Sequence, residues 1–142
     1  MKIRRWLPLT ALLMTVAPAW AACTVSATGV AFGPYDPFSL TSLDSTGNVA
    51  VTCSPASPYT IELSPGVGAQ TARELRSGAH VLAYNLFTEA TRSTVWGDGT
   101  GLTSTVSGSG TGGGHPIYGR IPARQNVAVG SYSDALTVTV TF

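Results

Sequence analysis

Residues 130–142 read GSYSDALTVTVTF, and this stretch decides the fold. Toward its end, apolar side chains alternate strictly with threonines. A period of two places the apolar side chains on one face of a β-strand and the threonines on the other. The apolar face consists of Leu136, Val138, Val140 and Phe142. Because Val, Thr and Phe suit a pleated, half-buried surface, the stretch predicts a strand with one face in a core.

The sequence ends on Phe142, within this strand, and no polar tail follows it. A terminal strand is normally followed by a few loosely held residues. We therefore expect this strand to lie at the edge of its sheet, where a strand supplied by another chain completes the fold.

The first residues have the three parts of an export signal. A basic start precedes an apolar run over residues 6–16, and residues 19–21 read Ala-Trp-Ala, a cleavage pattern. The apolar run is too short for a membrane span. We therefore predict a signal peptide at residues 1–21 and one exported domain at residues 22–142, which does not insert into the membrane. Lipid attachment at Cys23 is an alternative form of processing.

The charge of the exported part limits its partners. Residues 22–142 contain five arginines, seven acidic residues and no lysine. This balance argues against nucleic acid or an anionic membrane surface as a partner. Charged residues are sparse throughout, which fits a β-rich structural protein.

Two cysteines, Cys23 and Cys53, follow the export signal. An even pair of cysteines in an exported chain indicates a disulfide between them. A metal or redox pair is the alternative interpretation. Against it, no Cys-x-x-Cys spacing occurs, and only His80 and His115 are available to assist.

Short strand-like stretches recur along the chain, separated by residues typical of turns. No window after the export signal shows a helical period over three turns. Strands at this spacing indicate an antiparallel β-sandwich. Residues 107–114 contain five glycines and predict a flexible loop. The expected strands before the terminal one include residues 24–32, 47–53, 59–63, 73–77, 81–88 and 116–121.

Catalytic patterns are missing from the sequence. No Gly-x-Ser-x-Gly motif occurs, and no Lys-Ser or Lys-Thr follows the glycine-rich stretch as it does in a phosphate-binding loop. The two histidines stand alone and the acidic residues are scattered. We expect neither enzymatic activity nor a cofactor or metal site.

Five segments, taken together and in this order, resemble the spore coat protein U-like domain family. The same family builds the pilins of archaic (Csu-type) chaperone–usher pili. The segments cover nearly all of the exported part. They are Cys23, GNVAVTC at 47–53, VLAYNLF at 81–87, PIYGRI at 116–121 and GSYSDALTVTVTF at 130–142.

The resemblance implies an incomplete immunoglobulin-like β-sandwich that lacks its last strand. The missing strand would leave an apolar groove beside the terminal strand. A periplasmic chaperone would fill this groove first, and the donor segment of a neighbouring pilin subunit would replace it at the usher, by β-strand addition. The expected function is thus a structural subunit of a secreted surface fibre, located on the cell surface or in a pilus. The expected groove residues are Leu136, Val138, Val140 and Phe142.

A polymerising pilin carries a donor segment before its first cysteine. If cleavage follows Ala21, only Ala22 precedes Cys23. We therefore expect a subunit that accepts a strand and donates none, which suits a position at a chain end. The alternative function is a self-contained spore- or cell-surface coat or adhesive module that needs no donor.

Overall fold

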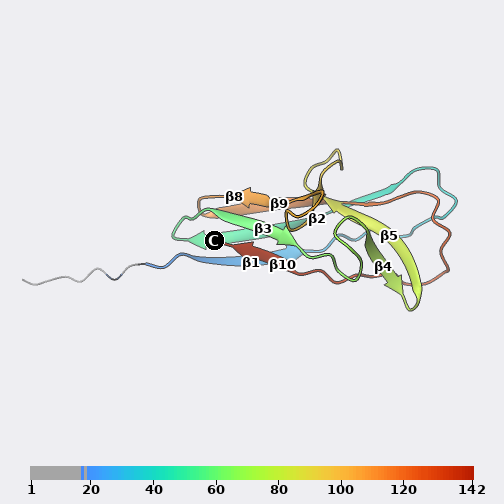
Figure 1. Ribbon diagram of the computed structural model, residues 1–142, viewed down its shortest axis with the longest axis horizontal. Coiled ribbons are helices and arrows are strands. Elements are labelled where there is room, and N and C mark those ends of the chain that lie inside the picture. Colours follow the sequence, from blue (N-terminus) through green and yellow to red (C-terminus); the bar gives the residue numbers. More distant parts are fainter. Residues whose placement is uncertain (1–16, 18) are drawn as a thin grey trace, which may run out of the picture.

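The computed structural model describes residue 17 and residues 19–142. Most of the predicted signal peptide lies outside the described residues. The described part of the chain is all-β and consists of ten strands arranged in two sheets (Figure 1). None of its residues belongs to a helix long and apolar enough to cross a membrane.

The larger sheet has the strand order β1-β2-β9-β5-β6-β7, and β4 pairs with β5 outside this path. Its strands are β1 (Ala22–Thr28), β2 (Leu43–Ser54), β4 (Arg73–Ser77), β5 (His80–Phe87), β6 (Val95–Trp96), β7 (Thr103–Ser104) and β9 (Gly112–Ile121). The smaller sheet has the order β10-β3-β8. Its strands are β10 (Val138–Thr141), β3 (Tyr59–Leu63) and β8 (Val106–Gly108). The predicted antiparallel β-sandwich is confirmed.

The core lies between the two sheets and follows the predicted alternation. Alternate residues of three strands are buried, because a strand sends every second side chain to the same face. Trp96 also lies in the core, where its indole N–H donates to the Ile61 carbonyl at 3.1 Å. The buried alternate residues are Val49, Val51 and Cys53 of β2, Tyr59, Ile61 and Leu63 of β3, and Leu82, Tyr84 and Leu86 of β5.

Arg73 is a buried cation that the sequence pattern did not reveal. Its guanidinium is fully buried and donates to the Trp96 carbonyl at 2.8 Å and to Oε1 of Gln70 at 2.8 Å. Burial lowers the pKa of Arg73. Because buried charges are retained where hydrogen bonds compensate them, this side chain joins the start of β4 to β6 and to the loop that follows β3.

The glycine-rich stretch is not the flexible loop that was predicted. Gly112 and Gly113 already belong to β9, and only residues 109–111 connect β8 to β9. A Cβ at Gly112 would collide with the Val51 carbonyl, and its φ of +105° disfavours other residues. Glycine is therefore required here for close approach of two strands, and the prediction of a loop over residues 107–114 was wrong.

The first and last strands are both shorter than predicted. The β1–β2 ladder ends at the pair Thr28–Asn48, whereas the prediction extended the strand to residue 32. The terminal strand β10 pairs only with β3, which has five residues. A ladder extends no further than its partner, so β10 is limited to Val138–Thr141.

Candidate functional site

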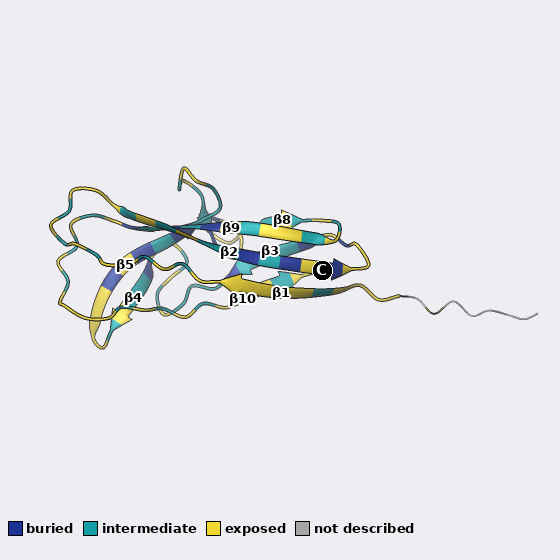
Figure 2. Ribbon diagram, turned by 180° about the vertical axis from the view of Figure 1, so that it is seen from behind, coloured by how far each residue is buried: buried dark blue, intermediate teal, exposed yellow. Residues whose placement is uncertain are grey.

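Two strands at the rim of the sandwich each have one unpaired edge. β1 pairs only with β2 in the larger sheet, and β10 pairs only with β3 in the smaller sheet. Figures 1 and 2 show the two strands beside each other at the same rim of the molecule. Among the described residues, no hydrogen bond or ladder joins them. The two sheets are thus not joined by hydrogen bonds along the rim where β1 and β10 lie.

The inner face of β1 is apolar and only partly covered. Val25 lies opposite Val51, and Ala27 lies opposite Val49, so these β1 side chains point to the same side as two buried valines. Val25 is nevertheless 45% exposed. Figure 2 shows most of β1 coloured as exposed. A strand placed along the free edge of β1 would cover this face.

The inner face of β10 forms the other wall of this rim. Val138 lies opposite Leu63, and Val140 lies opposite Ile61, so both point to the core side. Leu136, Val138 and Val140 pack against the core and are partly buried. Phe142 follows the end of β10 and is 56% exposed. Of the four predicted groove residues, Val138 and Val140 therefore lie in β10, whereas Leu136 precedes the strand and Phe142 follows it.

Next along the chain from these strands lies a cleft of about 590 Å³. One wall is formed by residues 30–35, which follow β1, and the other by residues 127–134, which precede β10. Leu75, Leu82 and Ile121 are also part of its lining. We call the rim formed by the unpaired edges of β1 and β10, together with this cleft, the rim groove. Sequence reasoning missed the part of the groove that contains the cleft.

The wall at residues 127–134 is attached to the hairpin of β4 and β5. Ser133 and Arg76 exchange two backbone hydrogen bonds, at 2.8 and 3.0 Å. The Tyr84 hydroxyl donates to Oδ2 of Asp134 at 2.6 Å. Burial, together with the carboxylate of Asp134, raises the pKa of Tyr84. Tyr84 therefore remains a neutral donor that keeps this wall in place.

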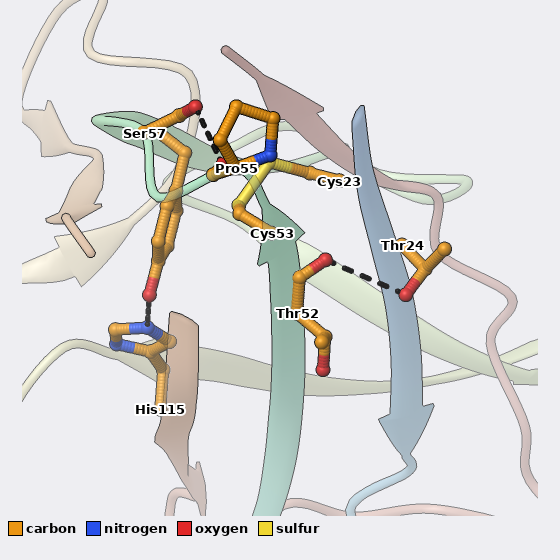
Figure 3. Close-up of a disulfide and its surroundings, with 8 residues drawn as sticks. Cys23, Thr24, Thr52, Cys53, Pro55, Ser57 and His115 are labelled. Atoms are coloured by element: carbon orange, nitrogen blue, oxygen red, sulfur yellow. Dashed lines mark hydrogen bonds between the residues drawn. A yellow bond between two sulfur atoms is a disulfide. The ribbon is translucent and has the colours of Figure 1, made fainter. Parts of the chain in front are cut away.

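A disulfide attaches β1 to β2 at the end of the rim groove that lies away from the cleft. The structure contains the predicted bridge between Cys23 and Cys53, which lie directly opposite each other in the β1–β2 ladder (Figure 3). Nearby, the Tyr59 hydroxyl and Nε2 of His115 lie 2.8 Å apart and connect β3 to β9. Because β1 has one partner strand only, the disulfide is its covalent attachment to the sheet.

The rim groove is mainly apolar, and its strands carry no charge. Neither β1 nor β10 contains a charged residue. Asp134, on the wall of the cleft, already accepts hydrogen bonds from Tyr84 and from the backbone N–H of Val67 and Ala135. The described residues contain no group of three or more His, Cys, Asp or Glu arranged to hold a metal ion. The groove offers unpaired backbone groups and apolar side chains.

A family model described as the Spore Coat Protein U domain matches residues 9–139. The chain belongs to the spore coat protein U domain family. It is 33% identical to Protein U of Myxococcus xanthus over 151 aligned positions, which cover 94% of this chain and 84% of that protein. The family resemblance expected from the five sequence segments is therefore confirmed.

The fold of this spore coat protein U domain is also similar to a solved structure. That structure is the CsuC–CsuE chaperone–tip adhesion subunit pre-assembly complex from archaic chaperone–usher Csu pili of Acinetobacter baumannii. The TM-score is 0.60 and the sequence identity is 23%, over 87% of this chain. The match covers 40% of the other chain, so this domain corresponds to less than half of its length. The likeness supports an immunoglobulin-like sandwich of the pilin kind.

Proposed function

We propose that this domain is a structural subunit of a secreted surface fibre of the archaic chaperone–usher type, and that its rim groove accepts a strand from a partner. The observation that carries the proposal is the pair of unpaired edges on β1 and β10, whose inner faces are apolar and incompletely buried. An uncovered apolar edge promotes aggregation unless a partner pairs with it.

A strand inserted between β1 and β10 would stabilise the domain in two ways. Its backbone would pair with both free edges, as in other cases of β-strand addition. Its apolar side chains would cover Val25 of β1 and Val138 and Val140 of β10. Full burial of a side chain of this size contributes roughly 1.5–3 kcal/mol, so several partly covered residues add up to a large stabilisation.

The partners follow from the same proposal. A periplasmic chaperone occupies the rim groove first, and the donor segment of a neighbouring subunit replaces it at the usher. The likeness to a chaperone–subunit complex supports this order of partners. The domain is exported through the periplasm to the cell surface and has a structural role, not an enzymatic one.

A position at a chain end belongs to the proposal if the signal peptide is cleaved after Ala21. Ala22 alone would then precede Cys23 and its disulfide, too short a segment to act as a donor. Mass spectrometry of the N-terminal peptide of the secreted protein tests this cleavage site directly.

The second candidate function is a self-contained coat module. It is favoured by the family description, spore coat, and by the 33% identity to Protein U. This alternative requires that the domain be stable and monomeric without any donor. The two functions therefore predict different behaviour of the purified exported domain.

The decisive experiment fuses an alternating apolar strand to the C-terminus through a flexible linker. If the rim groove accepts a strand, the fusion raises the melting temperature by tens of degrees, because each kcal/mol corresponds to several degrees in a domain of this size. The control fusion carries serine at the apolar positions. Equal melting temperatures for the domain and both fusions would exclude strand acceptance and favour the coat module.

A further inference from the structure

Tyr35 connects the wall that follows β1 to the segment that leads into the other wall. Tyr35 comes at the end of the wall that follows β1. Its hydroxyl donates to the Pro122 carbonyl at 2.9 Å and accepts from the backbone N–H of Gln125 at 2.8 Å. Residues 122–125 lead directly into the other wall at residues 127–134. We call these two hydrogen bonds of the Tyr35 hydroxyl the Tyr35 closure.

The corner that Tyr35 contacts is itself anchored to the larger sheet. The side-chain amide of Gln125 binds both backbone groups of Ala83 in β5, as a neighbouring strand would. Nε2 of Gln125 donates to the Ala83 carbonyl at 2.8 Å, and the Ala83 N–H donates to Oε1 at 2.8 Å. The closure is thus fixed to β5 and is not a contact between two free loops.

The other end of the rim groove has no comparable closure. No hydrogen bond of the described residues joins β1 to β10. In Figure 1 these strands run to the end of the molecule where the chain terminus lies, whereas the loops with residues 36–42 and 122–126 lie at the opposite end. A strand can therefore extend past the open end, but at the other end it meets the Tyr35 closure.

We infer that Tyr35 is a register stop for the strand that the groove accepts, an inference that rests on the proposed function. Alternation alone leaves the register undetermined. A shift by one residue turns the apolar side chains to solvent, but a shift by two residues restores the same faces. Two residues of strand span about 6.6 Å, so a fixed obstacle at one end distinguishes registers that alternation treats as equal.

The register stop also determines where along the partner strand large apolar side chains are needed. The cleft of about 590 Å³ that Tyr35 helps to line is formed in part by the apolar residues Phe32, Leu75 and Leu82. A strand that ends at Tyr35 places its last apolar side chains in this cleft. The structure thus assigns to the partner a segment with large apolar residues at the end that reaches Tyr35, and smaller ones beside β1 and β10.

The test uses a probe whose sequence contains no register information. The probe is a synthetic peptide of alternating Val and Thr with a photo-cross-linking benzophenone at one end and a lysine tail at the other. A second peptide carries the two groups exchanged, so that either orientation in the groove is covered. Mass spectrometry of the cross-linked exported domain then locates the benzophenone end of the bound strand.

Tyr35→Phe removes both hydrogen bonds of the closure and keeps the ring. Tyr132→Phe is the matched control, because the Tyr132 hydroxyl donates to the Ala128 carbonyl at 2.8 Å within one wall of the same cleft. Gln125→Ala is a second test variant that releases the corner from β5. Thermal unfolding of each variant establishes that it is folded before the cross-links are compared.

We expect one peptide to cross-link at a single place beside residue 35 in the wild type and in Tyr132→Phe. In Tyr35→Phe and Gln125→Ala the sites should spread to places two residues apart. A strand in a shifted register has to open the Tyr35 closure. Loss of two hydrogen bonds of the closure lowers the cost of this opening and changes the ratio of the two registers roughly tenfold. Unchanged single-site cross-linking in both test variants would overturn the register stop.

The outcomes also separate this inference from the proposed function. If the wild type binds the peptides and gains thermal stability, but the cross-links are spread from the start, strand acceptance stands and the register stop is wrong. If neither peptide binds the wild type nor raises its melting temperature, strand acceptance fails and the register stop fails with it.

Discussion

Val25 lies directly opposite Val51 in the β1–β2 ladder, yet Val51 is 3% exposed and Val25 is 45% exposed. Paired residues point to the same side of a sheet and normally share the same cover. Val51 belongs to the buried core cluster, whereas Val25 lies on the edge strand β1, which among the described strands is paired on one side by β2. The difference in exposure places the open edge of the sandwich at β1.

The pair Val25–Val51 leads to a prediction about strand acceptance. Val25→Asp should abolish capture of a donor peptide, because a charge would be buried in an apolar groove. The free energy of unfolding of the domain alone should change by only about 1 kcal/mol, as for other half-exposed positions. Titration calorimetry with the peptide, and urea unfolding without it, measure the two effects.

Thr24→Asp provides the matched control, since Thr24 is the neighbouring residue on the opposite face of β1. This variant should bind the donor peptide as the wild type does. If both variants lost binding equally, the added negative charge itself, and not its position on the inner face of β1, would be the cause of the lost peptide binding.

Local alternation was enough to predict much of the core. The expected strands at 59–63 and 73–77 have the observed bounds of β3 and β4, and the expected apolar face of β2 is buried. Of the two apolar faces expected for β5, the face with Leu82, Tyr84 and Leu86 is buried, whereas Val81 on the other face is exposed. A period of two depends only on neighbouring residues, so it can be read without knowing the partner strand. The family resemblance added the expectation of a missing strand.

The cleft could not be predicted in the same way. Its walls, residues 30–35 and 127–134, contain no regular strand and are positioned by contacts distant in sequence, such as Tyr35 with Gln125 and Tyr84 with Asp134. A single tyrosine or glutamine in a loop has no periodic signal. For this reason the sequence prediction placed the groove only beside the terminal strand.

The disulfide should contribute to stability through the unfolded state. Cys23 and Cys53 are 30 residues apart, and closing a loop of this length contributes roughly 3–4 kcal/mol on the chain-entropy model. Replacing both cysteines by serine should lower the free energy of unfolding by about this amount. Urea unfolding measures it, and reduction of the wild type should give a similar midpoint. Two free thiols in unreduced wild-type protein would contradict the bridge itself.

A pH dependence is expected from Glu89, which precedes the β6 strand. Hydrogen bonds from the Ser93 hydroxyl, and next from the Thr88 hydroxyl, lower the pKa of Glu89 to about 2. The unfolded chain has a pKa of about 4.3 at this residue. A folded pKa below the unfolded one stabilises the fold above about pH 4.3, and this contribution is lost as the pH falls toward 2.

Glu89→Gln should therefore be less stable than the wild type at pH 7, with a difference that narrows between pH 5 and 2. Urea midpoints measured across this range follow the difference. Glu62→Gln, which removes a carboxylate from β3, controls for the change in net charge. A difference that stays constant down to pH 2 would show that ionisation of Glu89 does not contribute.

In the glycine-rich stretch, alanine substitutions at two neighbouring glycines should have different effects on stability. Gly112→Ala should destabilise the domain, because the new Cβ would collide with the Val51 carbonyl and the φ of +105° strains an alanine. Gly113→Ala is the matched control one residue later, since a Cβ there has nothing within 4 Å. Thermal unfolding should show a melting temperature several degrees lower for the first variant and little change for the second. If both variants unfold like the wild type, the close approach of Gly112 to Val51 does not constrain the fold, and the flexible loop predicted over residues 107–114 is favoured.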